Sequence, residues 1–239
     1  MKKSKLYFKL IIIILIFITT INSAFAGTDT VRCNTFETCS VEAEQGLAAA
    51  QYSLGYMYRF GFVMTHDSGE AFVKRDYAEA VKWFRAAAEQ GHTHAQFKLG
   101  KMYSSGIVVI RNYAEAARWY RAAAEQGHAR AQFSLGRMYY VGDGVTQDYV
   151  EAVRWSRAAA EQGFAFAQFN LGWSYRNGDG VIQDYLLAHM WLNISAANGN
   201  VSAAEARNLV SEQMSNDQII QAQALARQCI NSNYTDCAY

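Results

Sequence analysis

The 239-residue sequence contains no proline, which excludes proline-rich linkers and collagen-like structures. Charge is also scarce. Charged residues make up 18% of the chain against 51% hydrophobic residues, so the composition is that of a folding protein and not of a disordered one. The formal net charge is only +1. We therefore expect no nucleic-acid partner, because general nucleic-acid binding needs a strong positive excess.

The N-terminus has the layout of a cleaved secretory signal peptide. Four lysines precede an unbroken apolar run over 10–18, and a small-x-small site follows at 24–26. The run is well short of the roughly 18 residues of a membrane-spanning helix. We expect cleavage after Ala26 and no membrane span in the rest of the chain. Without these four lysines, the 22 basic residues fall to 18, against 21 acidic residues.

Cysteine is rare and lies only near the two ends of the chain. The four cysteines are Cys33, Cys39, Cys229 and Cys237. An exported protein enters an oxidising compartment, so disulfides are expected. The C-x-x-C spacings of zinc and redox sites are absent. Four cysteines allow three pairings, and the choice among them depends on the architecture.

The chain repeats itself with a period of 36 residues. Tryptophans and tyrosines recur at that spacing: Trp83, Trp119, Trp155 and Trp191, and Tyr77, Tyr113, Tyr149 and Tyr185. Leucine-glycine pairs end at Gly55, Gly100, Gly136 and Gly172, with steps of 45, 36 and 36 residues. The sequence therefore holds four units, and the first carries a nine-residue insertion.

Each unit is predicted to contain two helices. Over 95–103, apolar residues fall on one helical face. A second pattern over 112–126 begins at an N-cap residue, Asn112, and ends before Gly127, where a left-handed conformation favours glycine. The equivalent N-cap residues are Asp76, Asp148 and Asp184. Gly100 lies inside a helix at a cost of about 1 kcal/mol relative to alanine, which predicts close approach of a neighbouring helix.

Such a helix pair cannot bury its apolar face alone, so we expect an all-α, right-handed solenoid of four helix-turn-helix repeats. The expected organisation is a signal peptide (1–26), a cysteine-containing segment (27–42), four repeats over 43–199 (43–90, 91–126, 127–162, 163–199), and a C-terminal helical cap with a cysteine-containing tail (200–239). A capping box at Ser215 and Gln218 predicts a last helix over 219–228. Because the two ends of a solenoid lie several repeats apart, we favour the local disulfides Cys33–Cys39 and Cys229–Cys237.

The units resemble Sel-one-like repeats, relatives of the tetratricopeptide repeat. The third unit carries the pattern as Ala131-Gln132-x-x-Leu135-Gly136-x-Met138-Tyr139-x-x-Gly142-Asp143-Gly144-Val145. The period of 36 and the Gly-Asp-Gly-Val loop distinguish it from the tetratricopeptide unit of about 34 residues. The resemblance covers about 43–199 and implies an adaptor or scaffold that binds other proteins. Many bacterial members are exported and act in the envelope or on host cells.

The sequence contains no grouping of polar residues that is typical of a catalytic site. His92 and His128 hold the same position in successive repeats, which favours a structural role. Some cysteine-rich relatives are described as penicillin-binding or β-lactamase-like, but they carry a cysteine pair in each repeat. No serine here is followed three residues later by a lysine, as serine β-lactamases require. We expect no catalytic residue, metal or cofactor, with a β-lactamase-like or cell-wall hydrolase as the alternative.

The first helices of the four units contain no acidic residue over 47–60, 92–105, 128–141 and 164–177. One stripe on these helices, next to the core, corresponds to the concave groove of tetratricopeptide relatives. Aromatic residues beside arginines are typical of binding hot spots, and a basic groove favours an acidic peptide or a C-terminal carboxylate. The predicted partner-binding residues are Tyr56, Arg59, Lys101, Arg130, Arg137, Tyr140, Phe166, Trp173 and Arg176. Four other stripe residues, Tyr52, Phe97, Phe133 and Phe169, are expected to pack between repeats.

The loop between the two helices of a unit changes along the chain. Units three and four keep Gly-Asp-Gly-Val, whereas unit two has Gly-Ile-Val-Val-Ile over 106–110. Val108 replaces a glycine, so we expect a different backbone in this loop. Unit one has an apolar segment at 60–64 and then the insertion, through Lys74. The two apolar loops would form a second binding patch, unless the insertion folds back and covers it; both alternatives remain open.

The sequence therefore predicts an exported, non-catalytic protein–protein interaction module. It would be an adaptor, scaffold or regulator in the periplasm or outside a bacterial cell. A further alternative is a secreted virulence factor that engages a host protein, because the same export signal and groove would serve both roles. The sequence identifies neither the partner nor the oligomeric state.

Overall fold

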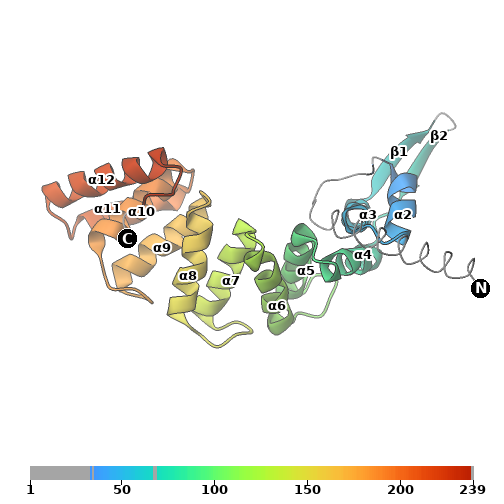
Figure 1. Cartoon of the computed structure of the whole chain (residues 1–239), viewed down its shortest axis with the longest axis horizontal. Helices are drawn as coiled ribbons and strands as arrows, with labels where there is room; N and C mark the ends of the chain where they lie inside the picture. Colours follow the sequence, from blue (N-terminus) through green and yellow to red (C-terminus); the bar gives the residue numbers. More distant parts are fainter. Residues whose placement is uncertain (1–32, 34, 67–68, 238–239) are drawn as a thin grey trace, which may run out of the picture. The chain divides into compact units, whose positions relative to one another are not determined.

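The computed structural model describes residues 33, 35–66 and 69–237 (Figure 1). These residues form helices and one two-stranded hairpin. The predicted signal peptide over 1–26 lies outside the described residues. The chain divides into two compact units between Leu99 and Gly100, inside helix α5 (Thr93–Ser105).

In the first unit, α2 (Phe36–Glu44) and α4 (Tyr77–Glu89) both pack against α3 (Ala48–Phe60). Leu54 of α3 is almost completely buried and belongs to a small core that includes Cys33 and Cys39. These two cysteines form a disulfide. It is the first of the two local disulfides that the sequence favoured.

The insertion in the first repeat forms an antiparallel hairpin, β1 (Phe62–His66) and β2 (Gly69–Val73). The register pairs Phe62 with Val73 and His66 with Gly69. The sequence pattern predicted helices only, so these strands were not expected. The sequence does carry a pattern that is typical of a hairpin: two short segments that contain apolar residues are separated by the turn-forming residues Asp-Ser-Gly.

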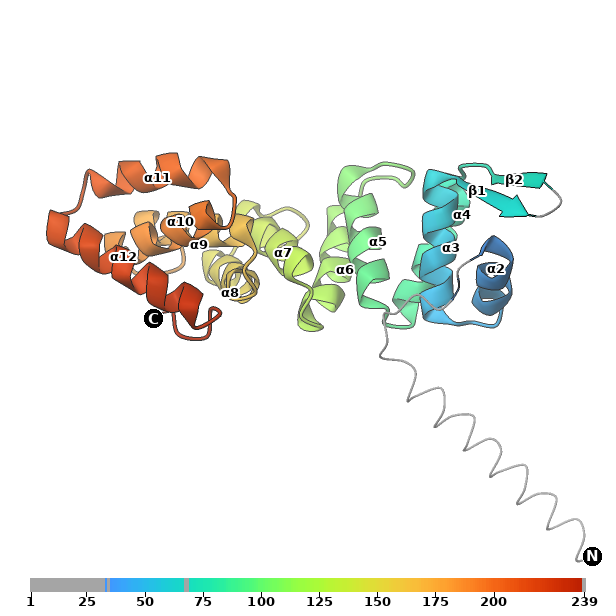
Figure 2. The same ribbon diagram turned by 90° about the horizontal axis from the view of Figure 1, so that it is seen from above.

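The second unit is itself a stack of helices. They are α6 (Tyr113–Glu125), α7 (Ala129–Val141), α8 (Tyr149–Ala160), α9 (Ala165–Asn177), α10 (Tyr185–Ala197), α11 (Val201–Ser211) and α12 (Asn216–Asn231). From α6 to α11 each helix packs against the next, and α12 folds back onto α10 (Figures 1 and 2). The predicted all-α class, with helix-turn-helix repeats and a C-terminal capping helix, is confirmed.

The core of the second unit is centred on α10. Trp191 and Met190 of this helix are fully buried, and α9, α11 and α12 contribute further apolar side chains. Cys229 and Cys237 belong to the same cluster and form the second disulfide. The C-terminal tail is thereby fixed against the last repeat, as the favoured local pairing implied.

The predicted N-cap residues are confirmed by their hydrogen bonds, although α12 extends three residues beyond the predicted 219–228 at each end. Asp148 Oδ1 accepts the backbone N–H groups of Val150 and Glu151 over 2.9 and 3.0 Å. Equivalent caps are made by Asp76, Asn112 and Asp184. The capping box of Ser215 and Gln218 opens α12. Each cap satisfies backbone donors that a helix start would otherwise leave unpaired.

The glycines inside the first helices allow the two helices of a repeat to touch. A Cβ added at Gly100 would lie 2.7 Å from Cδ1 of Tyr120, and one at Gly172 would lie 2.7 Å from Cγ of Leu192. The close approach predicted from Gly100 is therefore confirmed. Packing against a large side chain offsets the helix propensity that glycine loses.

No helix in the described ranges is both long and apolar enough to cross a membrane.

Candidate protein-binding surface

The predicted partner-binding residues fall into two sets. Tyr56 and Arg59 lie on α3 in the first unit, and the other seven lie in the second unit. None of the nine is buried. Five of them are exposed and four, Tyr56, Arg59, Trp173 and Arg176, are half-buried. Their role in binding stays a prediction.

In the first unit, Tyr56 lies at the centre of an aromatic cluster. Its ring meets Phe84 edge-on at 5.7 Å between centroids and stacks on Phe60 at 5.6 Å. Lys98 Nζ lies 5.0 Å from the centroid of the same ring. Burial raises the pKa of Tyr56, but the hydrogen bonds and positive charge around it, chiefly from Lys98, outweigh burial and lower the pKa below its ordinary value.

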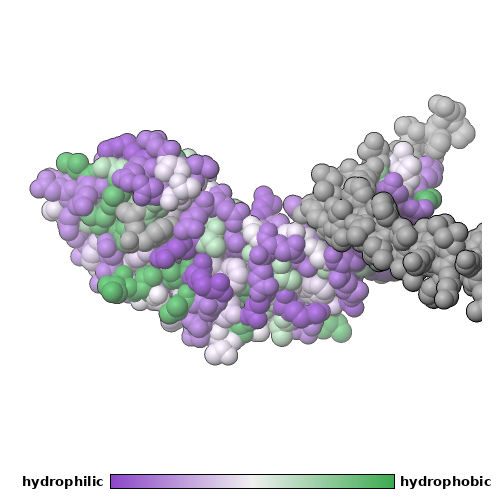
Figure 3. Space-filling model, viewed as in Figure 1, coloured by the Kyte–Doolittle hydropathy of each residue, from purple (hydrophilic) through white to green (hydrophobic). Residues whose placement is uncertain are grey.

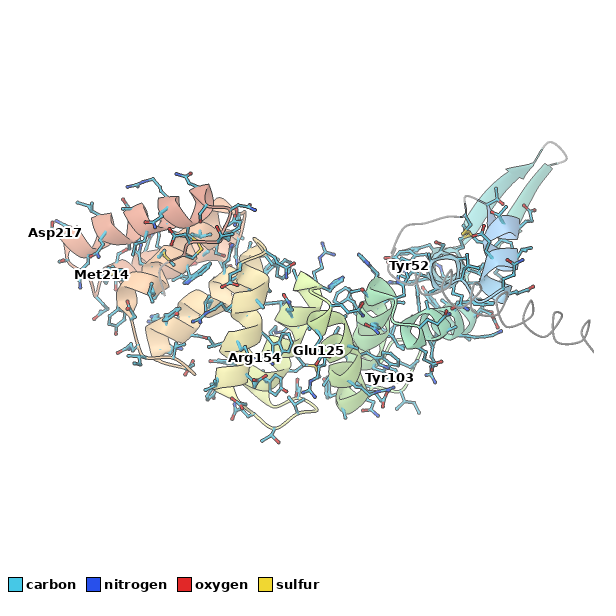
Figure 4. The ribbon with its side chains drawn as sticks, viewed as in Figure 1. Tyr52, Tyr103, Glu125, Arg154, Met214 and Asp217 are labelled. Carbon is cyan, nitrogen blue, oxygen red and sulfur yellow. A yellow bond between two sulfur atoms is a disulfide. The ribbon has the colours of Figure 1, made fainter. Side chains whose placement is uncertain are left out.

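Tyr52 joins this aromatic cluster from the preceding turn of α3 (Figure 4). Its ring stacks on His92 at 4.5 Å between centroids and meets Tyr56 at 5.0 Å. This is the packing role that the sequence favoured for Tyr52. The cluster gives the first unit a group of packed aromatic rings with Lys98 beside it.

In the second unit, three predicted residues meet at one pocket. Arg137 and Tyr140 of α7 and Trp173 of α9 line a cavity of about 240 Å³. Arg176 lies over the ring of Trp173, with its Cζ 4.4 Å from the centroid. Arg137 is exposed, and within the described part of the chain it forms no ion pair. An exposed guanidinium that lines the same pocket as an indole ring is well suited to bind a carboxylate together with an apolar group.

Phe166 marks the other end of this surface. It is 57% exposed and lies 6.2 Å from Phe133 and 5.8 Å from Phe164, between ring centroids. Phe133 and Phe169 are partly buried against the core, as expected for packing residues. Lys101 and Arg130 are exposed and contribute positive charge to the first-helix face. Figure 3 shows hydrophilic and hydrophobic residues intermixed over the visible face of this unit.

The second helices present a different surface, on which charges neutralise one another. Arg118 pairs with Glu115 at 2.9 Å, and Arg154 pairs with Glu151 at 2.7 Å. The Arg154 hydrogen bond lowers the pKa of Glu151. Each arginine also covers the tryptophan that follows it in sequence. Exposed pairs of this kind stabilise a helix by only a few tenths of a kcal/mol, which supports the interpretation of a solvated face.

The loop of the second repeat corrects one expectation from the sequence. Val108 has a φ of 77°, close to the 69° of Gly144 and the 72° of Gly180 at the equivalent positions. The loop therefore keeps the left-handed backbone at this position although a β-branched residue occupies it. The prediction of a different backbone was wrong, because it assumed that valine would avoid this region.

The apolar residues of the second-repeat loop remain at the surface. Ile107 and Ile110 are 65% and 93% exposed. Whether this loop is a second binding patch stays a prediction.

The repeated histidines have a structural role, as predicted. Nδ1 of His92 accepts the N–H of Ala95, and Nδ1 of His128 accepts the N–H of Ala131, both over 3.2 Å. Each imidazole therefore caps the start of a first helix. Among the described residues, no three His, Cys, Asp or Glu side chains gather in a group that could hold a metal ion.

Two residues of the surface were missed by the sequence analysis. Lys98 lies outside the predicted stripe but contacts Tyr56. Ser156, on the second helix of its repeat, lines the pocket of Arg137 and Trp173. The signal for Ser156 was present in the repeat alignment: positions 84, 120, 156 and 192 hold Phe, Tyr, Ser and Leu.

Together, the paired helices, the inter-helix glycines and the acid-free first helices define a helical repeat protein related to tetratricopeptide proteins. The Sel1 repeat model matches residues 48–92, 93–128, 129–164 and 165–200. These ranges make up more than half of the chain, which therefore belongs to the Sel1 repeat family. Proteins of this family are commonly protein–protein interaction modules and are generally non-catalytic scaffolds.

Two solved structures show the same fold. A Sel1 repeat protein from Oxalobacter formigenes is 34% identical, with a TM-score of 0.65 over 81% of this chain and 77% of that one. The protein c5321, a protective antigen present in uropathogenic Escherichia coli strains and displaying an SLR fold, is 29% identical. Its TM-score is 0.54, and the match covers 83% of this chain but only 50% of c5321. A comparison with curated proteins finds no match.

Proposed function

We propose that the protein is an exported binding module that holds a protein or peptide partner on the first-helix stripe. The observation that carries this proposal is the pocket of the second unit, where Arg137, Tyr140 and Trp173 meet. Hot spots of protein interfaces are enriched in these three residue types. The two first helices that carry them contain no acidic residue, and Asp179 at the rim is held by Tyr140, so an acidic segment or a C-terminal carboxylate is the ligand we expect for Arg137.

Export is supported by two features of the chain. The N-terminal sequence has the order of a signal peptide, with its cleavage site after Ala26. Both disulfides, Cys33–Cys39 and Cys229–Cys237, are consistent with an oxidising compartment. The proposed place of action is therefore the bacterial envelope or the outside of the cell.

The experiment that tests the binding surface is site-specific photo-crosslinking in the native host. A photoreactive amino acid replaces Arg137 on α7 and, in a matched control, Arg118 on α6, because both are exposed arginines in the middle of a helix. We expect one discrete polypeptide to be captured from position 137 and not from position 118. Capture from neither position, or equally from both, would exclude the first-helix stripe as the binding surface.

A further inference from the structure

The pocket lined by Arg137, Tyr140 and Trp173 lies where one repeat has a small residue and the others have a large one. In the first, second and fourth repeats, Phe84, Tyr120 and Leu192 pack against the glycine inside the first helix. A Cβ on that glycine would lie within 2.9 Å of these side chains. In the third repeat the position belongs to Ser156, so the space that Phe, Tyr or Leu occupies elsewhere is left open.

The shape of the pocket follows from this substitution. Gly136, Ala152 and Ser156 are buried and form its floor, while Arg137 and Tyr140 are exposed and form its rim. Val141 of α7 and Asn170, Trp173 and Ser174 of α9 complete the lining. A cavity of about 150 Å³ already accommodates benzene, and this one measures about 240 Å³. It has room for one large side chain.

We propose that this pocket binds one large apolar side chain of a partner peptide, with an adjacent carboxylate held by Arg137. This inference rests on the proposed function and adds to it the chemistry of the ligand. The apolar group takes the place that the protein's own Phe84, Tyr120 and Leu192 fill in the other repeats. The carboxylate meets the exposed guanidinium of Arg137, and the amide of Asn170 is within the same lining for the peptide backbone.

The central test variant is Ser156→Leu, which gives the third repeat the residue of the fourth. Leu192 packs on Gly172 in the geometry that Gly136 offers to position 156, so the new side chain fills the pocket from inside. We expect the variant to be at least as stable as the wild type, because cavity filling buries apolar area without new strain. If this variant lost binding, the loss could then be attributed to the filled pocket and not to unfolding.

The probe is a library of random peptides displayed on phage and selected on the full exported chain. We expect the selected peptides to share a Leu, Phe or Met next to Asp, Glu or a free C-terminus. Ser156→Leu should weaken their binding by roughly tenfold to a hundredfold, the equivalent of burying one such side chain. Ser202→Leu, the same change at an exposed position on α11, should leave affinity unchanged. Arg137→Glu should weaken binding as well.

The outcomes separate this inference from the proposed function. If the selected peptides bind Ser156→Leu as tightly as the wild type but lose affinity for Arg137→Glu, the pocket inference is wrong and the stripe remains the binding surface. If both variants bind like the wild type, both proposals fail. If selection enriches no peptide of the expected pattern, the pocket inference is also overturned.

A second variant covers the case in which Ser156→Leu fails to fold. Ser156→Val fills only part of the cavity and should give an intermediate loss of affinity, while Ser156→Ala leaves the cavity open and should retain binding. Equal affinity of the valine and alanine variants would contradict the pocket. Melting curves of each variant confirm the fold in every comparison.

Discussion

The hydroxyl of Tyr140 donates a hydrogen bond to Asp179 Oδ2 over 3.0 Å, which joins α7 of the third repeat to the loop after α9 in the fourth. Burial and this carboxylate raise the pKa of Tyr140. The ring is 42% exposed all the same. The bond holds an exposed aromatic side chain in one orientation at the rim of the pocket. Less side-chain conformational entropy is therefore lost when a partner binds.

Loss of this hydrogen bond should be measurable in stability. We expect Tyr140→Phe to lower the free energy of unfolding by about 0.5–1.5 kcal/mol, because the ring stays and only the bond is lost. Urea denaturation of Tyr140→Phe, Asp179→Asn and the double variant forms a double-mutant cycle. Strict additivity of the two single changes would show that the two groups do not interact in solution.

The left-handed backbone at Val108 predicts a stabilising substitution. This conformation costs a residue other than glycine about 1–2 kcal/mol, and the greater freedom of glycine in the unfolded chain offsets part of that. Val108→Gly should therefore raise the free energy of unfolding by up to about 1 kcal/mol. The matched control is Val145→Gly, since Val145 is not among the residues with positive φ. Destabilisation by both changes would contradict the strained backbone at Val108.

Buried His189 predicts a dependence of stability on pH. Its side chain is 2% exposed, and burial, followed by the charge of Arg207, lowers its pKa to about 4. The unfolded chain binds a proton at this residue below a pH of about 6.5, whereas the folded chain does so only below about 4. Stability contributed by the neutral imidazole is therefore present above pH 6.5 and is lost as the pH falls toward 4.

Between pH 6.5 and about 4, the free energy of unfolding should fall by roughly 3 kcal/mol because of this residue. We expect His189→Gln to flatten the slope of unfolding free energy against pH, as measured by urea midpoints between these limits. His94→Gln, at an exposed histidine, serves as the control and should keep the slope of the wild type. An unchanged slope in His189→Gln would assign the pH dependence to other groups.

Processing of the N-terminus tests the proposed export. The protein isolated from its native host should begin at Gly27, because the predicted cleavage follows Ala26. N-terminal sequencing measures this directly, and Ala24→Asp with Ala26→Asp should block the cleavage. A chain isolated with its N-terminal lysines intact would contradict the prediction of a cleaved signal.

Features that recur with the repeat could be predicted from the sequence. The N-cap at Asp148 and the inter-helix glycine at Gly100 each have equivalents in the other units, so one pattern was seen several times. The physical reason is that each repeat solves the same local problem, namely how to begin a helix and how to bring two helices together. The surface position of the stripe follows from the same helical period.

Features that occur once were missed or misjudged. The hairpin of Phe62–His66 and Gly69–Val73 lies in an insertion without a counterpart in the other repeats. The conformation of Val108 is set by its loop and overrides the residue's own preference. The pocket at Ser156 forms where a side chain is small, and a small side chain indicates a pocket only when the packing partners at the equivalent positions are known.

The affinity of the crosslinked partner for altered full-length protein tests the central claim most directly. Arg137→Glu combined with Trp173→Ala removes the charge and the aromatic surface of the pocket, whereas Arg118→Glu changes the charge of the second-helix face alone. Calorimetric titration should show that the double variant binds at least about tenfold more weakly, since hot-spot residues contribute about 2 kcal/mol or more each. The control should bind like the wild type. Unchanged affinity in the double variant would contradict the assignment of the first-helix stripe as the binding surface.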